Sequence, residues 1–412
     1  MPEFPAAPEI SAADSWEDLA PVVELAYGGY GHSADYHASA ASIFEPKRSL
    51  VARTGGRVSG TCAVYSLEMT LPGGPRPVAG LGYVSVAPEH RRRGVMSAMV
   101  RRVLHTLHDG GGEPVAALNT TEAGIYGRFG FGLASQAAKV RIHRHARGLR
   151  LDGGDRTDRT VRIGEPAEHT AALAAVYAHC VRERPGTLGR NAAWAARAVL
   201  DLPDHRGGSG RLLCMVAEQD GEPSGYALYR LTAAWEGAVP RYEVSVRELF
   251  ARDPGSHTAL WHALLDVDLA GSVVADRPVD DPVLALLTDP RSAAPVLRDQ
   301  LHVRLVDVDR ALEQRGYATE TDLVLDVTDP LCPWNERRFR LRTGPEGGEC
   351  RPTTAPADLE LGVRELGAVH LGGTSLGQLA RAGLVRELRP GAVRAAATAF
   401  RHDPAPFCPI VF

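Results

Sequence analysis

Residues 82–97 combine the residue types that hold a pyrophosphate where a strand leads into a helix. The run reads Gly82-Tyr83-Val84-Ser85-Val86-Ala87-Pro88-Glu89-His90-Arg91-Arg92-Arg93-Gly94-Val95-Met96-Ser97. Such a site needs outward-pointing backbone N–H groups, a positive helix end and a residue without Cβ, which Gly94 supplies. The alternative is a basic, solvated helix start. Three arginines there oppose the helix macrodipole unless an anion lies among them, so the pattern favours a phosphate-bearing ligand.

The pattern V-x-V-x-P-x-x-R-R-R-G-V resembles the acetyl-CoA motif of the GNAT superfamily, and specifically the Eis-type (enhanced intracellular survival) N-acetyltransferases. The run Thr121-Glu122-Ala123-Gly124-Ile125-Tyr126-Gly127-Arg128-Phe129-Gly130-Phe131-Gly132 is similar to the catalytic-tyrosine segment of that family. Met96 departs from the superfamily preference for Gly or Ala, which matters little if only backbone faces the phosphate. The resemblance implies acetyl-CoA as co-substrate and no metal. It implies coenzyme contacts from Val84, Ser85, Val86, Arg91, Arg92, Arg93, Gly94, Val95, Met96, Ser97, Thr121 and Glu122.

Acetyl transfer to an amine sets three chemical requirements. The amine must be neutral, the oxyanion needs a hydrogen-bond donor, and the departing thiolate needs an acid. By resemblance, the Val86 amide is the oxyanion donor, Tyr126 is the acid, and the C-terminal carboxylate of Phe412 is the base. The non-catalytic alternatives are that Tyr126 is an aromatic residue of the core and that the tail ending in Phe412 docks only for stability. His32 is a further candidate base, although a lone loop histidine is more often simply exposed.

The elements that must position these groups form an α/β unit. Strands are expected at residues 49–53, 58–69, 78–86 and 114–118, and helices at 14–27, 93–108 and 121–129. A similar layout recurs further on, which suggests a diverged duplication. It comprises helices at 167–184 and 256–269 and strands at 212–218, 225–231 and 242–250. In this second unit, the position that corresponds to the arginines of the first holds an acid, in the run Ala251-Arg252-Asp253-Pro254-Gly255-Ser256. The second domain is therefore expected to bind no coenzyme. Asp253 or Ser256 is expected to be an ordinary helix cap.

The remaining chain predicts an α+β domain. Its expected helices are 303–314, 374–382 and 391–399, and its strands 322–327, 338–343 and 358–363. Its end, residues 404–412, is stiff and apolar, whereas most termini are polar and frayed. The predicted fold is therefore α/β and α+β, with two tandem GNAT-like domains followed by one that resembles a sterol carrier protein. The predicted boundaries are 1–147, 148–290 and 291–412, with a polar linker at 148–159.

Charge and cysteine content indicate which classes of partner and which cellular compartment to expect. Forty-six basic against 50 acidic side chains leave a net charge of −4, which gives no reason to expect nucleic acid or an anionic membrane as a partner. Six cysteines without a C-x-x-C pair argue against a disulfide framework or a zinc site and for a reducing cytoplasm. No secretory signal or membrane-spanning apolar stretch is visible.

The acceptor is expected to be a small-molecule amine, with an aminoglycoside-like polyamine modified at several positions as the first candidate. In the family, pocket acids lie in the first helix–loop and next to the terminal residue. Here residues 26–32 and 410–412 contain no carboxylate side chain, and Glu24 and Asp35 are by default solvated. A protein or peptide lysine and a secondary-metabolite amine stay open. The alternative of another class is a non-catalytic scaffold that binds coenzyme or lipid. A hexamer is expected solely by resemblance.

Overall fold

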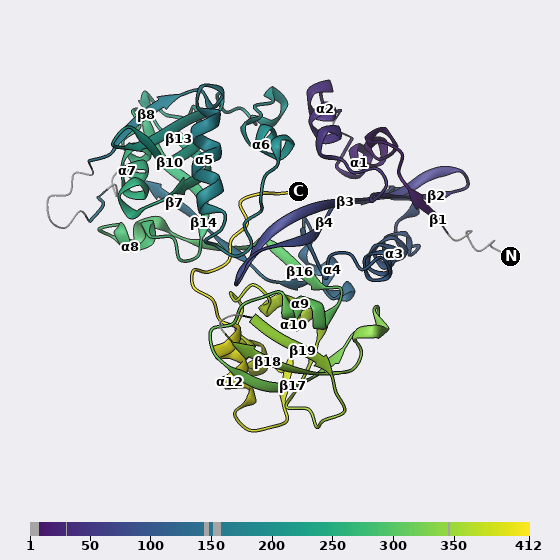
Figure 1. Cartoon of the computed structure of the whole chain (residues 1–412). Coiled ribbons are helices and arrows are strands. Elements are labelled where there is room, and N and C mark those ends of the chain that lie inside the picture. The colour runs from purple at the N-terminus through teal and green to yellow at the C-terminus, as the bar shows by residue number, and fades with distance from the viewer. Residues whose placement is uncertain (1–7, 30, 144–147, 151–157, 345–346) are drawn as a thin grey trace. The chain divides into compact units, whose positions relative to one another are not determined.

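The computed structural model describes residues 8–29, 31–143, 148–150, 158–344 and 347–412. The chain divides into two compact units (Figure 1). Unit 1 is Met1–Ser135 with Gln300–Phe412, and unit 2 is Gln136–Asp299. In the described part of the chain, no helix is both long enough and apolar enough to cross a membrane.

The first sheet of unit 1 is built around a long hairpin of β3 and β4. From edge to edge it contains β1 (Glu9–Ala12), β2 (Leu50–Thr54), β3 (Arg57–Leu71), β4 (Gly74–Val86), β5 (Val115–Asn119), β16 (Leu301–Leu305) and β6 (Gly132–Leu133). The helices of this part are α1 (Ala20–Ala26), α2 (Ala34–Ile43), α3 (Val95–Asp109) and α4 (Ala123–Tyr126). Figure 1 shows α1 and α2 on one side of the hairpin and α3 on the other.

Helix α3 is held on the sheet by one apolar stripe. The stripe repeats at three- and four-residue spacing, as expected of an amphipathic helix, and consists of Val95, Met99, Val100, Val103, Leu104 and Leu107. It packs on buried residues of the sheet such as Leu50, Val64 and Leu81. This packing fixes the N-terminus of α3 at the end of β4, where the arginine-rich loop lies.

Strand β16 corrects the predicted helix at 303–314. Leu301, Val303 and Leu305 are fully buried, and the strand pairs antiparallel with β5 and β6. The helix α9 covers only Val308–Glu313. A short run with both faces buried has no clear period of two, so periodicity alone cannot separate such a strand from a helix.

Unit 2 has a sheet of its own with a similar mixed layout. In order it contains β15 (Val296–Asp299), β7 (Gln136–His143), β14 (Ala270–Pro278), β13 (Tyr242–Ala251), β10 (Glu222–Thr232), β9 (Leu213–Gln219) and β8 (Thr160–Gly164). Short strands β11 (Trp235–Glu236) and β12 (Val239–Pro240) pair separately. The helices are α5 (Thr170–Cys180), α6 (Ala192–Val199), α7 (Pro254–Leu265) and α8 (Val283–Leu286).

The sheets differ from the predicted boundaries in two places. Strand β7 precedes residue 147 but belongs to the sheet of unit 2, and β16 follows residue 290 but belongs to the first sheet of unit 1. Residue 147 itself and residues 151–157 of the predicted linker lie outside the described residues. Each of these two sheets therefore includes a strand from beyond its predicted domain boundary.

The helix cap predicted in unit 2 is confirmed at Asp253. Its carboxylate accepts a hydrogen bond from the Ser256 backbone N–H at 2.8 Å and another from the Ser256 hydroxyl at 2.7 Å. The Arg159 guanidinium donates to the same carboxylate at 3.1 Å. The start of α7 thus carries its own anion, and we infer that a phosphate has no place there.

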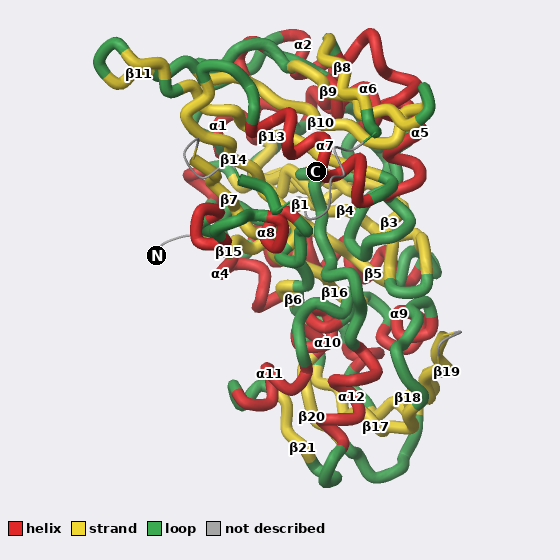
Figure 2. Tube along the Cα trace, turned by 90° about the vertical axis from the view of Figure 1, so that its left-hand side faces the viewer, coloured by secondary structure: helices red, strands yellow, loops and turns green. Residues whose placement is uncertain are grey.

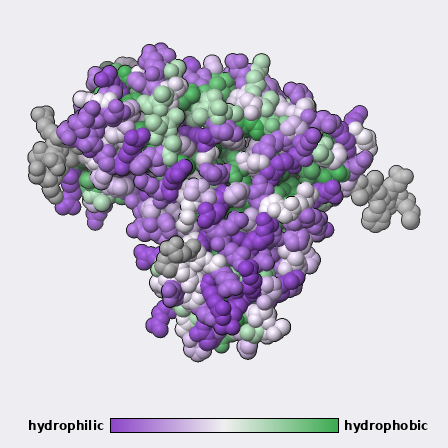
Figure 3. Space-filling model, viewed as in Figure 1, coloured by the Kyte–Doolittle hydropathy of each residue, from purple (hydrophilic) through white to green (hydrophobic). Residues whose placement is uncertain are grey.

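The last domain of unit 1 contains the strands β19 (Gly347–Pro352), β18 (Arg338–Gly344), β17 (Thr321–Thr328), β20 (Leu359–Gly362) and β21 (Val385–Glu387). Its helices after α9 are α10 (Val363–Val369), α11 (Leu376–Arg381) and α12 (Ala392–Phe400). In Figures 1 and 2, α10 lies between β16 and this sheet. Figure 3 shows a mostly hydrophilic surface over β18 and β19, where ion pairs such as Arg340–Asp322 are exposed. One face of this sheet is therefore charged.

Candidate active site

The arginine-rich loop ends in a left-handed turn that opens the N-terminus of α3. Arg92 has φ 62° and Gly94 has φ 82°. Gly94 is the N-cap residue and contributes no side-chain cap, and the first N–H groups of a helix have no partner within it. Arg91, Arg92 and Arg93 are exposed, and none has an acidic partner among the described residues. This combination of open N–H groups and unpaired cations fits a pyrophosphate.

Strands β4 and β5 separate where the loop approaches. They pair in parallel only at Ala79 with Ala116 and at Gly80 with Ala117. Tyr83 is in the left-handed region with φ 46°, and the Thr61 hydroxyl donates to its carbonyl at 2.9 Å. The segment Val84–Val86 thus follows a local distortion of β4 and faces the opening between the two strands. That opening is where an extended ligand could contact the strand backbone.

Tyr126 is both part of the core and available for hydrogen bonding. Its ring is 9% exposed and lies 6.0 Å from the ring of Phe131, measured between centroids. No described residue forms a hydrogen bond with its hydroxyl. Burial raises the pKa of this phenol, and the nearby Cys62 thiol raises it further. Tyr126 therefore stays protonated at neutral pH, as an acid must.

Cys62 itself is not a candidate nucleophile. It is fully buried on β3, and burial raises the pKa of its thiol to about 12. The thiolate is the reactive form, so this cysteine is inert at neutral pH. Its contribution is to pack beside Tyr126.

The C-terminal tail ends on β4. Gln300 holds the tail, since its side-chain amide donates to the Cys408 carbonyl at 2.9 Å and accepts from the Cys408 N–H at 3.2 Å. Phe407 and Cys408 are buried. At the end, a Cβ on Gly82 would lie 2.9 Å from the carboxyl carbon of Phe412, and a Cβ on Gly80 would lie 2.9 Å from its ring. Gly80 and Gly82, just before Val84 on β4, therefore make room for the terminal residue.

Arg304 is a supporting residue that sequence reasoning missed. It is fully buried on β16 and donates to the Phe129 carbonyl at 2.9 Å, in the turn that follows Tyr126. Its Nη2 nitrogen donates to both carboxylate oxygens of Asp329, at 2.8 and 2.6 Å. Gly130 has no room for a side chain because Arg304 occupies that space. Arg304 thus links Asp329 of the third domain to the turn that follows Tyr126.

Two other groups were missed as well. The side-chain oxygen of Asn119, at the end of β5, is buried and accepts no hydrogen bond in the described structure. Thr121 and Glu122 follow it and are exposed. On α1, Glu24 is not the solvated surface acid that was expected, because it is only 30% exposed and accepts a hydrogen bond from His37. A polar residue directly after a strand could have pointed to Asn119, but no sequence signal pairs Glu24 with His37.

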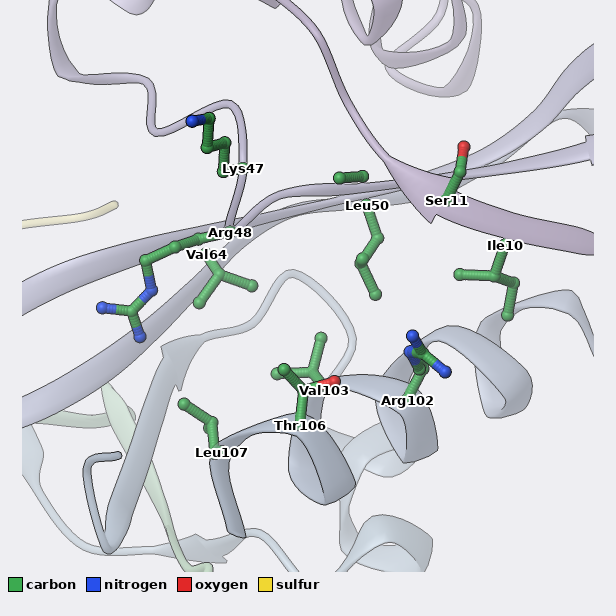
Figure 4. Close-up of a pocket in the computed structure, with 11 residues that line it drawn as sticks. Ile10, Ser11, Lys47, Arg48, Leu50, Val64, Arg102, Val103, Thr106 and Leu107 are labelled. Atoms are coloured by element: carbon green, nitrogen blue, oxygen red, sulfur yellow. The ribbon is translucent and has the colours of Figure 1, made fainter. Parts of the chain in front are cut away.

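A separate groove of about 190 Å³ lies between α3 and the strands β1, β2 and β3 (Figure 4). Its apolar lining includes Leu50, Val64, Val103 and Leu107, and Lys47 and Arg102 also line it. None of the predicted site residues lines this groove. Among the described residues, no group of His, Cys, Asp and Glu side chains is placed to hold a metal ion.

Comparison with known proteins agrees with this architecture. Models of the acetyltransferase (GNAT) domain match residues 10–134 and 186–305, and a sterol carrier protein domain matches residues 308–409. The N-acetyltransferase Eis of Mycobacterium tuberculosis is 34% identical over 359 residues, which cover 85% of this chain and 84% of that protein. The chain belongs to the Eis family of GNAT N-acetyltransferases. This confirms the predicted fold class and the predicted enzyme class.

Two further relatives match over nearly the whole length of this chain and of their own. An uncharacterized N-acetyltransferase of Streptomyces avermitilis is 41% identical over 398 residues, 96% of this chain and 97% of the relative. The crystal structure of Eis1 from Mycobacterium abscessus superposes with a TM-score of 0.83 and 32% identity, covering 98% of this chain and 100% of that one. Since GNAT acetyltransferases use acetyl-CoA, the acyl donor of this enzyme is acetyl-CoA.

Gly94→Ala tests the coenzyme loop. There is open space for the methyl group, but φ at this position is 82°. A left-handed alanine costs about 1–2 kcal/mol, so we expect the KM for acetyl-CoA to rise roughly tenfold while kcat changes little. Steady-state kinetics with varied acetyl-CoA measures both. An unchanged KM would mean that the turn does not hold the coenzyme.

Proposed function

We propose that this Eis-family enzyme transfers the acetyl group of acetyl-CoA to an amine of a small molecule, with Phe412 as base and Tyr126 as acid. The observation that carries the proposal is the docking of the terminal carboxyl group beside Gly82, next to the distorted end of β4.

The proposed steps divide the work between three groups. The donor supplies a thioester, whose carbonyl carbon the amine attacks. The Phe412 carboxylate accepts a proton from the acceptor ammonium, which frees the attacking lone pair. The Val86 N–H stabilises the charge that develops on the carbonyl oxygen. As the carbon–sulfur bond breaks, Tyr126 donates its proton to the departing sulfur. The proton that the acylated nitrogen loses at this stage restores Tyr126, and the proton that Phe412 accepted is released to solvent. Because burial raises its pKa, Tyr126 is protonated at neutral pH, which is the form that a proton donor needs.

Residues on both sides of the opening between β4 and β5 are proposed to bind the coenzyme. On the β4 side, Val84, Ser85 and Val86 offer backbone groups. The pyrophosphate is assigned to the loop and helix start, namely Arg91, Arg92, Arg93, Gly94, Val95, Met96 and Ser97. On the β5 side, Asn119 offers a buried acceptor for an amide N–H of the pantetheine arm, followed by Thr121 and Glu122.

The acceptor is tested by an amine panel with mass-spectrometric detection. The panel contains aminoglycosides, lysine peptides, alkyl and aryl amines, and diamines, so that it represents every candidate class of acceptor. We expect acetylated products together with thiol release, and the number of added acetyl groups shows whether one or several positions react. If no amine is acetylated and the purified protein carries lipid, the non-catalytic scaffold is the better description.

The assembly and the compartment stay predictions. The hexamer expected from the family is tested by mass photometry of the purified chain. A cytoplasmic location is tested by cell fractionation.

A further inference from the structure

The groove between α3 and the strands β1, β2 and β3 is a gap in an otherwise closely packed core. On α3, Met99 and Leu104 are fully buried beneath the sheet. The apolar side chains that line the groove are packed less completely, since 4% of Val103, 7% of Leu107 and 9% of Leu50 remain exposed. The apolar floor of the groove is therefore accessible from solvent.

Three cationic side chains line the groove, and two of them lack an acidic partner in the described part of the chain. The Arg48 guanidinium is neutralised by Glu113, whose carboxylate oxygens lie 2.7 and 2.9 Å from its nitrogens. Lys47 and Arg102 are exposed and form no ion pair with any described residue. Among those residues, no acidic side chain lines the groove. Two positive charges thus lie uncompensated beside an apolar surface.

The apolar and cationic side chains come from elements that face one another. In Figure 4, Leu50 and Val64 extend from the strands toward α3, whereas Arg102 extends from α3 toward β1. A guanidinium at the edge of the gap can donate two parallel hydrogen bonds to one carboxylate. Lys47, on a flexible stem in the segment before β2, adds a second positive charge. The groove volume of about 190 Å³ is sufficient for a short alkyl chain, because an apolar cavity of about 150 Å³ holds benzene.

We propose that this groove binds a small amphipathic carboxylate, such as the anion of a medium-chain fatty acid, at a site separate from the active site. The alkyl chain lies between the strands and α3, and the carboxylate lies at Arg102 and Lys47. An amine acceptor does not fit, because the two unpaired cations repel an ammonium group. The residues proposed to bind the coenzyme lie outside the groove.

A simple packing defect makes a different prediction. In that case the groove contains only water, and a carboxylate with an alkyl chain has no reason to bind there better than one without a chain. Binding that requires both the chain and the charge of the probe therefore separates the two interpretations.

Isothermal titration calorimetry of the full chain with octanoate tests the site, with octan-1-ol and acetate as matched probes. We expect one octanoate per chain, and each CH₂ added from butanoate to octanoate should tighten binding about fourfold. Octan-1-ol lacks the charge and acetate lacks the chain, so each should bind at least about tenfold more weakly. Saturating coenzyme A should leave octanoate binding in place, because the two sites are separate.

Two substitutions on α3 locate the bound octanoate. Arg102→Gln removes the guanidinium and should weaken binding about tenfold, the factor typical of a hydrogen bond to a charged group. Thr106→Phe replaces an exposed residue that lines the groove with a ring that fills it, and should abolish binding. Arg101→Gln is the matched control, because Arg101 is a neighbouring exposed cation that does not line the groove. It should bind octanoate as the wild type does.

The groove site would be overturned by a wild type that binds no octanoate, by octanoate that coenzyme A displaces, or by Arg102→Gln binding it at full strength. Thermal melts of the variants check that each chain is folded. Because the readout is direct binding, a chain that binds octanoate but acetylates no amine would refute the proposed function alone. The two failures are therefore distinguishable.

Discussion

Tyr126→Phe is expected to lower kcat for acetyl transfer by about 100-fold or more, the range typical of losing a general acid. The ring is 9% exposed and packs against Phe131, so phenylalanine fills the same space. Since the hydroxyl has no hydrogen-bond partner among the described residues, its removal leaves no polar group unsatisfied. Thiol-release kinetics measures the loss, and calorimetric titration with coenzyme A should show unchanged binding.

Tyr317→Phe is the matched control for this substitution. Tyr317 is also buried in unit 1, but its hydroxyl donates to the Leu312 carbonyl at 2.7 Å, in the third domain. We expect a lower melting temperature and an unchanged kcat. If Tyr126→Phe retained wild-type kcat, Tyr126 would be a core aromatic and the leaving thiolate would be protonated by another group.

The pH dependence adds a second readout of Tyr126. Burial raises the pKa of the phenol above its usual value near 10, so the protonated, active form persists to higher pH. The wild-type kcat should therefore show no decline from deprotonation of this acid up to about pH 9. A basic limb that vanished in Tyr126→Phe would contradict the assigned direction.

Adding one glycine after Phe412 is expected to reduce kcat by about 100-fold, since the carboxylate base is replaced by a neutral amide at the same place. The docking of the tail depends on residues before the terminus, including the paired hydrogen bonds of Gln300 with Cys408. The extended chain should therefore fold and bind coenzyme normally. Stopped-time acetylation assays and thermal melts measure the two properties.

Gly82→Ala tests the same carboxylate without altering the terminus. Its methyl group would lie 2.9 Å from the carboxyl carbon and 2.9 Å from the Tyr65 ring, so the terminal residue must shift. Activity should fall with the carboxylate chemically intact. Gly344→Ala, whose methyl group would only reach a van der Waals contact of 3.9 Å with Glu320, is the control. Full activity of the extended chain would refute the carboxylate base.

The conformation of the loop proposed to bind the coenzyme was largely predictable because it is local. This loop depends on neighbouring residues: a strand, adjacent cations, and Gly94 with φ 82° at the start of a helix. The same local logic identified Asp253 as the cap that fills the corresponding place in unit 2. Short-range rules for turns, caps and dipoles apply to both, since they need no knowledge of what packs nearby.

Strand membership was less predictable. The run at β16 has buried residues on both faces, so its burial pattern does not alternate, and it was expected to be helical. It becomes a strand because β5 and β6 supply hydrogen-bond partners from far earlier in the chain, as the pairings of Leu301 with Asn119 and of His302 with Leu133 illustrate. Arg304, which supports the tyrosine turn, was missed for the same reason.

By itself, the sequence determined the class of enzyme, because its phosphate-loop pattern and tyrosine segment resemble those of Eis-type acetyltransferases. The role proposed for the terminal carboxylate came from that resemblance alone. Only the tertiary structure decided what surrounds those groups. Gln300 reaches Cys408 across 108 residues, and His37 turns an apparently ordinary surface acid, Glu24, into an oriented carboxylate. These contacts depend on how elements pack, and packing joins residues whose separation in sequence carries no local signal.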